Sequence, residues 1–221
     1  MAKIINHQTT QANFTLIPRK PIDQNVDTTK LKAKLSDIFE NSKVILTQFP
    51  EIVILFDPNN QISVNILRDQ NRIIIADNIV TPYSSRPLEN FFRFAKEAID
   101  IINNNEIKDY GFNILSSFDL ENGAIDSGDF VKENYIKKEK FNTLGMLKSA
   151  GLKVIYEKGS TRCELRIEPR IDPDLNPTKS VSINHNSHFA GQQLPDLTTL
   201  QSQCQEIYNG LPGDIEKIFS V

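Results

Sequence analysis

The sequence predicts an α+β fold, in which antiparallel β-meanders carry helices packed on one face. Short β-branched runs separated by turn sequences indicate the strands, and apolar residues at helical spacing indicate the helices between them. A comparable order of elements occurs in both halves. We therefore expect similar α+β subdomains over residues 1–105 and 106–221, with one continuous domain as the alternative.

The first half begins with a short strand at residues 13–17, followed by a helix that starts at Asp27 or Thr28. Either residue can cap this helix, and apolar residues recur at helical spacing to about Asn41. Pro87 then opens a helix with a wide apolar stripe. Between these helices we expect an antiparallel meander of four short strands: residues 44–49, 52–56, 62–67 and 73–76.

The second half is expected to open with a hairpin of residues 111–120 and 125–136. Asn122-Gly123 lies between these runs and is a strong signal for a type I′ turn. A helix is expected at residues 137–150, where apolar side chains recur at helical spacing. The run Asn103-Asn104-Asn105 marks the boundary between the halves, with a simple helix stop as the alternative.

A second hairpin should pair residues 152–157 with residues 162–168 and turn at Gly159-Ser160. A two-residue loop places Tyr156 opposite Cys163, so the apolar side chains of the two strands lie on the same face of the hairpin. We expect this region to be a pleated ribbon with one buried side and one ionic side.

A strand at residues 180–186 and a closing helix at residues 195–209 complete the predicted elements, and the helix should break at residues 210–213 because of their glycine and proline. The resulting order is similar to that of TATA-box-binding-protein-like and helix-grip architectures. No motif supports a family assignment, and the order of elements does not define a function.

Composition and charge exclude several classes of protein. The chain has 221 residues, 39% of them hydrophobic and 24% charged, with a net charge of -3. General nucleic-acid binding is disfavoured, because it normally requires a basic surface. No apolar run approaches the ~20 residues that cross a bilayer, and the polar start indicates no signal peptide. We therefore expect a cytoplasmic protein without a membrane partner.

The motifs of nucleotide and hydrolase chemistry are absent from the sequence. No glycine precedes Gly111, and the remainder contains no GxGxxG, GxxxxGK or GxSxG pattern. Cys163 and Cys204 match no metal spacing and are expected in the core. His185 and His188 would point to opposite faces of a strand, so they should not share a metal. We expect no cofactor and no metal.

The most distinctive polar feature is a row of charged residues on one strand, where they alternate with the apolar Cys163, Leu165 and Ile167. We call these four residues the charged row: Arg162, Glu164, Arg166 and Glu168. Such arginines could hold a carboxylate or phosphate, although a solvent-exposed sheet face produces the same pattern. The charged row and its expected neighbours give the candidate ligand-binding residues: Arg162, Glu164, Arg166, Glu168, Asn184 and His188.

These observations predict a non-catalytic binding or assembly protein that acts through contacts with a protein partner or with itself. One alternative is a protein that binds a small anionic ligand between helix and sheet, with Arg162 or Arg166 as its anchor. Another is an enzyme that uses His185 or His188 with Glu164 or Glu168 as acid and base. Phe94 lies away from its helix's apolar centre and suits either a contact with another chain or a second core layer.

Overall fold

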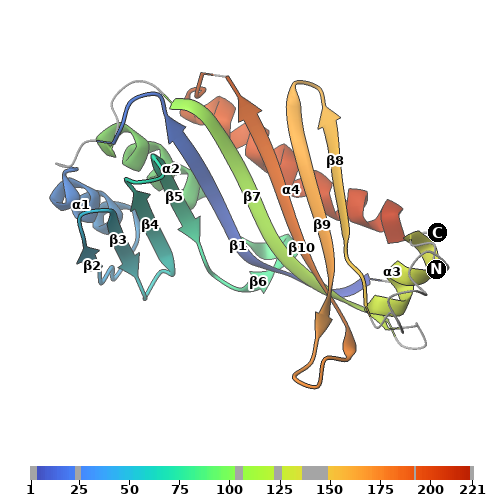
Figure 1. Cartoon of the computed structure of the whole chain (residues 1–221). Coiled ribbons are helices and arrows are strands. Elements are labelled where there is room, and N and C mark those ends of the chain that lie inside the picture. Colours follow the sequence, from blue (N-terminus) through green and yellow to red (C-terminus); the bar gives the residue numbers. More distant parts are fainter. Residues whose placement is uncertain are drawn as a thin grey trace.

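The computed structural model describes residues 4–22, 26–102, 107–121, 126–135, 149–191 and 193–219. Within these ranges, ten strands form one antiparallel sheet in the order β2-β3-β4-β5-β1-β7-β10-β9-β8, with β6 paired to β1 (Figure 1). The strands are β1 (Ile4–Pro18), β2 (Ile45–Gln48), β3 (Ile52–Asp57), β4 (Ile62–Leu67), β5 (Arg72–Asp77), β6 (Thr81–Pro82), β7 (Ile107–Leu120), β8 (Leu152–Lys158), β9 (Thr161–Ile171) and β10 (Pro177–Ala190). The helices are α1 (Thr28–Ile38), the short η1 (Tyr83–Ser85), α2 (Glu89–Ile102), α3 (Ser127–Tyr135) and α4 (Leu197–Phe219).

The strand order repeats about the central pair β1 and β7. Moving outward from this pair, β5, β4 and β3 occupy one side in the same order as β10, β9 and β8 on the other. Each half ends with a helix, α2 after β5 and α4 after β10. The α+β class and the antiparallel sheet are confirmed, and the pairing of β1 with β7 makes the sheet continuous across both halves.

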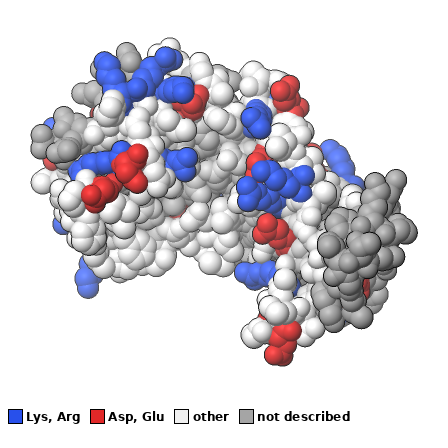
Figure 2. All heavy atoms as spheres, in the orientation of Figure 1, with Lys and Arg blue, Asp and Glu red and all other residues white. Residues whose placement is uncertain are grey.

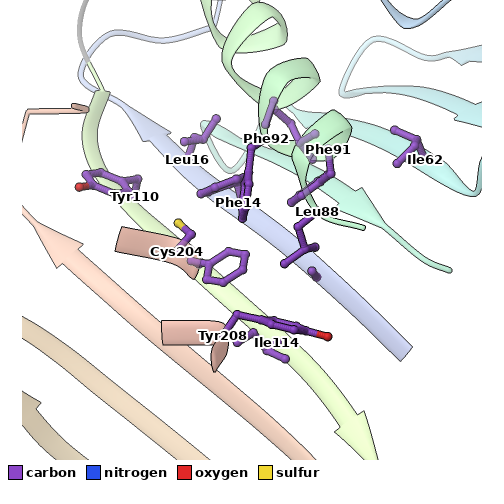
Figure 3. Packing of buried hydrophobic residues seen from close by; sticks show 14 of the residues in the cluster. Phe14, Leu16, Ile62, Leu88, Phe91, Phe92, Tyr110, Ile114, Cys204 and Tyr208 are labelled. Carbon is purple, nitrogen blue, oxygen red and sulfur yellow. The ribbon is translucent and has the colours of Figure 1, made fainter. Parts of the chain in front are cut away.

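Helices α1, α2 and α4 lie on one face of the sheet, which we call the covered face (Figure 1). Alternate residues of each strand point into it; on β1 these include Phe14, which stacks on Phe91 of α2 with ring centroids 5.6 Å apart. Cys204 of α4 is buried in the same core (Figure 3). Cys163 and Cys204 are thus buried free thiols, as predicted, and burial raises the pKa of the Cys204 thiol.

Phe94 belongs to the interior of the molecule. Its side chain is fully buried, and its ring meets Phe39 edge to face at 6.0 Å between centroids. Helices α1 and α2 pack against each other in this region. The alternative of a second core layer is therefore confirmed, and the predicted contact with another chain is wrong for this residue.

A polar junction fixes α4 to the sheet. Tyr83 of η1 and Tyr208 of α4 stack with ring centroids 4.2 Å apart, and the Tyr208 hydroxyl donates to the Tyr83 carbonyl at 2.8 Å. The Tyr83 hydroxyl in turn donates to the Tyr208 carbonyl at 2.7 Å. That carbonyl lies four residues before Pro212, which has no N–H to donate to it. Tyr83 therefore supplies the hydrogen bond that the proline removes.

This junction explains why the predicted break in the closing helix is wrong. Helix α4 runs without interruption through Gly210, Pro212 and Gly213. Leu211 and Ile215 continue its buried stripe, so burial of the stripe offsets the poor helix propensity of the glycines and the proline.

An ion pair lies buried near the same junction. Arg86 Nη2 is 2.9 Å from Asp77 Oδ1, and 0% and 3% of the two side chains are exposed. The guanidinium also donates to the carbonyls of Ile79 and Asp77, at 2.6 and 2.7 Å. Burial raises the pKa of the Asp77 carboxyl, while the charge of Arg86 opposes that rise. The pair joins the end of β5 to η1, although the buried Arg86 Nε has no hydrogen-bond partner.

The meander of the first half and the hairpin around Gly159-Ser160 are confirmed, including the pairing of Tyr156 with Cys163.

The hairpin predicted around Asn122-Gly123 is wrong. Strand β7 pairs with β1 and β10 instead, and residues 127–135 form α3. Asp126 caps this helix by accepting from the Asp129 N–H at 2.8 Å. Three predicted features lie outside the described residues: Asn122-Gly123, Asn103-Asn104-Asn105, and residues 137–148 of the helix expected at 137–150.

Candidate functional site

The opposite side of the sheet, which we call the helix-free face, carries the polar residues that alternate with the core. Strand register places Asn13 of β1 beside Asn113 of β7, Asn113 beside Asn186 of β10, and Asn186 beside Glu164 of β9. Because side chains of directly paired residues project from the same face, these four form one row across four strands. The row crosses the junction between the two halves.

Hydrogen bonds connect several carboxamides of this face. Asn113 donates to the Asn13 oxygen at 2.7 Å, Asn13 donates to the Gln11 oxygen at 2.7 Å, and Gln11 donates to the Asn78 oxygen at 2.6 Å. Asn78 then donates to Ser63 on β4 at 3.2 Å. The chain of hydrogen bonds holds these side chains in fixed orientations over strands from both sides of β1.

These side chains line a groove of about 470 Å³, which we call the carboxamide groove. Figure 2 shows uncharged surface between charged side chains that lie toward the sides of the view. The lining residues are Gln11, Asn13, Thr15, Ser63, Asn65, Ile74, Ala76, Asn78, Asn113, Leu115, Glu164, Arg166, Asn184 and Asn186. No aromatic ring belongs to this lining.

The charged row projects from the helix-free face, as the alternation predicts. Arg166 Nε donates to Glu164 Oε1 at 2.6 Å, and Lys153 Nζ on β8 approaches Glu164 Oε2 at 2.8 Å. Hydrogen bonds from Lys153 and Arg166 lower the pKa of the Glu164 carboxyl. Glu164 is therefore an ionised acceptor shared by two cations, which leaves one net positive charge at this end of the groove.

A second hollow, of about 230 Å³, adjoins the carboxamide groove at Thr15 and Asn186, which line both. We call it the Gly111 pocket, because Gly111 lies in its floor between the cross-strand neighbours Thr15 and His188. Its lining is Thr15, Ile17, Arg72, Asp109, Tyr110, Gly111, Asn186 and His188.

The six residues predicted for ligand binding divide among these features. Glu164, Arg166 and Asn184 line the carboxamide groove, and His188 lines the Gly111 pocket. Arg162 and Glu168 share their face of β9 but line neither hollow. Both hollows lie on the helix-free face, whereas the sequence suggested a ligand between helix and sheet.

His185 lies on the covered face, opposite to His188. It is 4% exposed, and its Nε2 is 3.0 Å from the Tyr156 hydroxyl. Burial lowers the pKa of His185 to about 4. This is the hydrogen-bonded core histidine that the alternation predicts, and its position separates it from Glu164 and Glu168 by the thickness of the sheet.

An apolar patch lies on the helix-free face of the first half, beside the carboxamide groove. Ile52, Ile54, Phe56 and Leu67 are partly exposed there, and Ile45 on the edge strand β2 is 52% exposed. Register pairs Ile45 with Phe56 and Ile52 with Leu67, so these side chains share one face. The described helices lie on the opposite side of these strands (Figure 1).

Sequence reasoning missed most of the groove. Gln11, Asn13, Asn113, Arg72 and Gly111 were not among the predicted site residues, although all line one of the hollows. Their signal was polar alternation in β1 and β7, as in Gln11-Ala12-Asn13-Phe14-Thr15. This alternation predicts a groove only once β1 and β7 are known to be long strands that pair with each other.

The described part of the chain contains no group of three or more His, Cys, Asp or Glu side chains arranged to hold a metal ion. None of its helices has the length and apolar character needed to cross a membrane. No protein-family model matches the sequence, and no curated protein is similar to it.

Proposed function

We propose that this chain is a non-catalytic binding protein whose helix-free face holds a polypeptide partner, a class that includes a second copy of the chain. The observation that carries the proposal is the juxtaposition of the apolar patch with the carboxamide groove on one uncovered sheet. Apolar contact area with fixed hydrogen-bonding groups beside it is the composition that protein interfaces use.

The chemistry of the groove favours a polypeptide over charged ligands. A carboxamide offers donors and an acceptor, so it can hydrogen-bond to both the N–H and the C=O of a peptide group. Glu164 neutralises one of the two cations that share it, so Arg166 and Lys153 leave only a single net positive charge at the groove. With a chain net charge of -3 as well, binding of a polyphosphate or nucleic acid finds little electrostatic support.

Two of the acid and base candidates, Glu164 and His185, favour binding over catalysis. Hydrogen bonds to two cations keep Glu164 ionised, so it is poorly suited to donate a proton. His185 lies on the other side of the sheet, buried under α4. The side chains that remain in the groove are mainly amides and hydroxyls, which orient a ligand without transferring protons.

The experiment uses a pool of short random-sequence peptides with N-terminal biotin and free C-termini, enriched on the wild-type protein. Enriched peptides are then titrated against three variants: Ile54→Asp in the apolar patch, Asn113→Ala in the groove and, as the matched control, Asn209→Ala at an exposed position of α4. We expect the first two substitutions to weaken binding about 10-fold or more and the control to leave it unchanged. Circular dichroism and thermal unfolding confirm that each variant is folded.

Two outcomes contradict the proposal. One is that no peptide is enriched above the level retained by a column without protein. The other is that binding survives Ile54→Asp and Asn113→Ala but is lost when exposed residues of α4 are changed. Sedimentation velocity of the wild type alone shows separately whether the partner is another copy of the chain.

A further inference from the structure

We propose that the Gly111 pocket binds the C-terminal carboxylate of a polypeptide whose preceding residues lie along the carboxamide groove. This inference rests on the proposed function and names the part of the partner that the site recognises. It is carried by two polar atoms without partners, by a missing side chain, and by the continuity of the two hollows.

Two buried polar atoms without a hydrogen-bond partner belong to side chains that line this one pocket. They are Arg72 Nε, a donor, and Asn186 Oδ1, an acceptor. Buried polar atoms in folded proteins are nearly always paired, because desolvation without a hydrogen bond is costly. A donor and an acceptor that are both unpaired, on side chains that line one small hollow, are the pattern expected of a ligand site.

Glycine at position 111 creates the space. A Cβ built there would lie 3.3 Å from Asn186 Oδ1 and 3.4 Å from the Ser187 carbonyl oxygen. Any larger side chain would project from the helix-free face and fill the pocket. Glycine normally weakens the interior of a strand, so its presence between Thr15 and His188 fits a close approach by another group.

The charges of the pocket select the ligand group. Arg72 supplies a guanidinium, whose planar N–H groups match a carboxylate, and His188 lines the pocket with it. The pocket's own carboxylate, Asp109, already accepts from the Gly191 N–H at 2.8 Å, and Lys108 Nζ lies 3.9 Å from its other oxygen. An anionic ligand group would therefore lie at Arg72.

Asn186 Oδ1 adds a second requirement, because the ligand must also carry a donor. The last residue of a polypeptide meets both requirements, since it has a carboxylate for Arg72 and a backbone N–H for Asn186. The pocket, at about 230 Å³, suits one terminal residue. The shared lining residues Thr15 and Asn186 then lead the preceding residues into the carboxamide groove. An N-acylated amino acid in free solution has the same chemistry and is the alternative source.

The test uses the enriched peptides in two forms, with a free C-terminus and with a C-terminal amide. We expect amidation to weaken binding to the wild type about 10- to 100-fold, the loss that follows from removing a charged hydrogen bond. Arg72→Gln should weaken the free-acid peptide by a similar factor, and amidation should then have little further effect. Arg93→Gln, which removes an exposed arginine from α2, is the matched control and should change nothing.

Gly111→Val supplies a second, independent variant. A β-branched residue suits a strand, so the protein should stay folded while the pocket is filled. We expect it to abolish the difference between the acid and the amide. Equal binding of both peptide forms by the wild type would overturn this inference. The proposed function would still stand in that case if Ile54→Asp and Asn113→Ala weakened both forms.

The small-molecule source is distinguished with N-acetylated amino acids, titrated against the wild type and Arg72→Gln. We expect them to bind much more weakly than the enriched peptides, because they make no contact with the carboxamide groove. Equal affinity would overturn the polypeptide as the ligand and assign the pocket to a free small carboxylate. Enrichment of no peptide at all would overturn both this inference and the proposed function.

Discussion

The two faces of the sheet hold similar side chains in opposite surroundings. On the covered face Arg86 and Asp77 pair at 2.9 Å with 0% and 3% of their side chains exposed. On the helix-free face Arg166 and Glu164 pair at 2.6 Å with 46% and 28% exposed. His185 is buried under α4, whereas His188 lines the Gly111 pocket. Burial, and not residue type, separates the groups that maintain the fold from those that can meet a ligand.

The largest expected effect comes from breaking the buried pair. Arg86→Met should lower the free energy of unfolding by about 3 to 5 kcal/mol, because it leaves the Asp77 carboxylate buried without its partner. Urea denaturation measures the change. Arg166→Met, on the helix-free face, should lower the free energy of unfolding much less, because water replaces the lost partner. Equal losses in the two variants would show that burial does not distinguish the two ion pairs.

Acid should act through two histidines of the covered side: His185, and His7 of β1, which stacks on Tyr83 with ring centroids 4.3 Å apart. Burial lowers the pKa of His185 and of His7 from 6.5 to about 4 in each case, so between these values the unfolded chain binds more protons than the native one. The free energy of unfolding should therefore fall as the pH drops from 6.5 to 4, with His185 contributing about 3 kcal/mol. Below pH 4 the histidine contribution is complete, and carboxyls whose pKa is lowered in the fold, such as Glu164 and Asp119, continue the fall. Denaturation curves at a series of pH values measure this slope.

Two substitutions sharpen this comparison of the faces. His185→Leu should reduce the pH dependence of stability, because the unfolded chain then gains no proton at position 185 and only the proton uptake at His7 remains. His188→Gln, on the helix-free face, should leave the slope as it is in the wild type. A slope that is unchanged in His185→Leu but reduced in His188→Gln would reverse the assignment.

A smaller effect is expected at the polar junction. Tyr83→Phe should cost about 1 to 3 kcal/mol, because the Tyr208 carbonyl, which has no partner within α4 at Pro212, then loses the Tyr83 hydroxyl. Combining Tyr83→Phe with Pro212→Ala, which restores an N–H in the helix, should recover part of the loss. Thermal unfolding of the single and double variants tests this, and simple additivity would show that the two sites are independent.

The smallest effect is expected at the exposed pair. Glu164→Gln should change the free energy of unfolding by less than about 1 kcal/mol, because water screens the Glu164 charge. It should nevertheless alter peptide binding, since two cations at the end of the groove lose their shared carboxylate. A large loss of stability with unchanged peptide binding would place Glu164 among the structural residues.

The parts of the fold that sequence could predict are those set by local chemistry. The meander and the hairpin at Gly159-Ser160 follow from alternation and from turn residues, and the charged row follows from the same alternation. The pairing of β1 with β7 joins residues about a hundred positions apart, which no local pattern specifies. The carboxamide groove depends on that pairing and was therefore missed.

Tertiary contacts also overrode two local signals. Gly210 and Pro212 predict a helix break, but the buried side chains of α4 and the Tyr83 hydroxyl keep the helix continuous. The segment after Asn122-Gly123 was expected to pair with β7, yet β10 occupies that edge and the segment forms α3. Both errors arise where a long-range contact stabilises a conformation that the nearest residues do not favour.

The most direct test of the helix-free face as the binding surface is an NMR titration. It records the side-chain amide signals of isotope-labelled protein as an enriched peptide is added. We expect the carboxamide signals of Asn13, Asn113 and Asn186 to shift together with the backbone signal of Gly111, while that of Asn209 on α4 stays in place. Shifts confined to α4 and the other helices would contradict the assignment of the helix-free face as the binding surface.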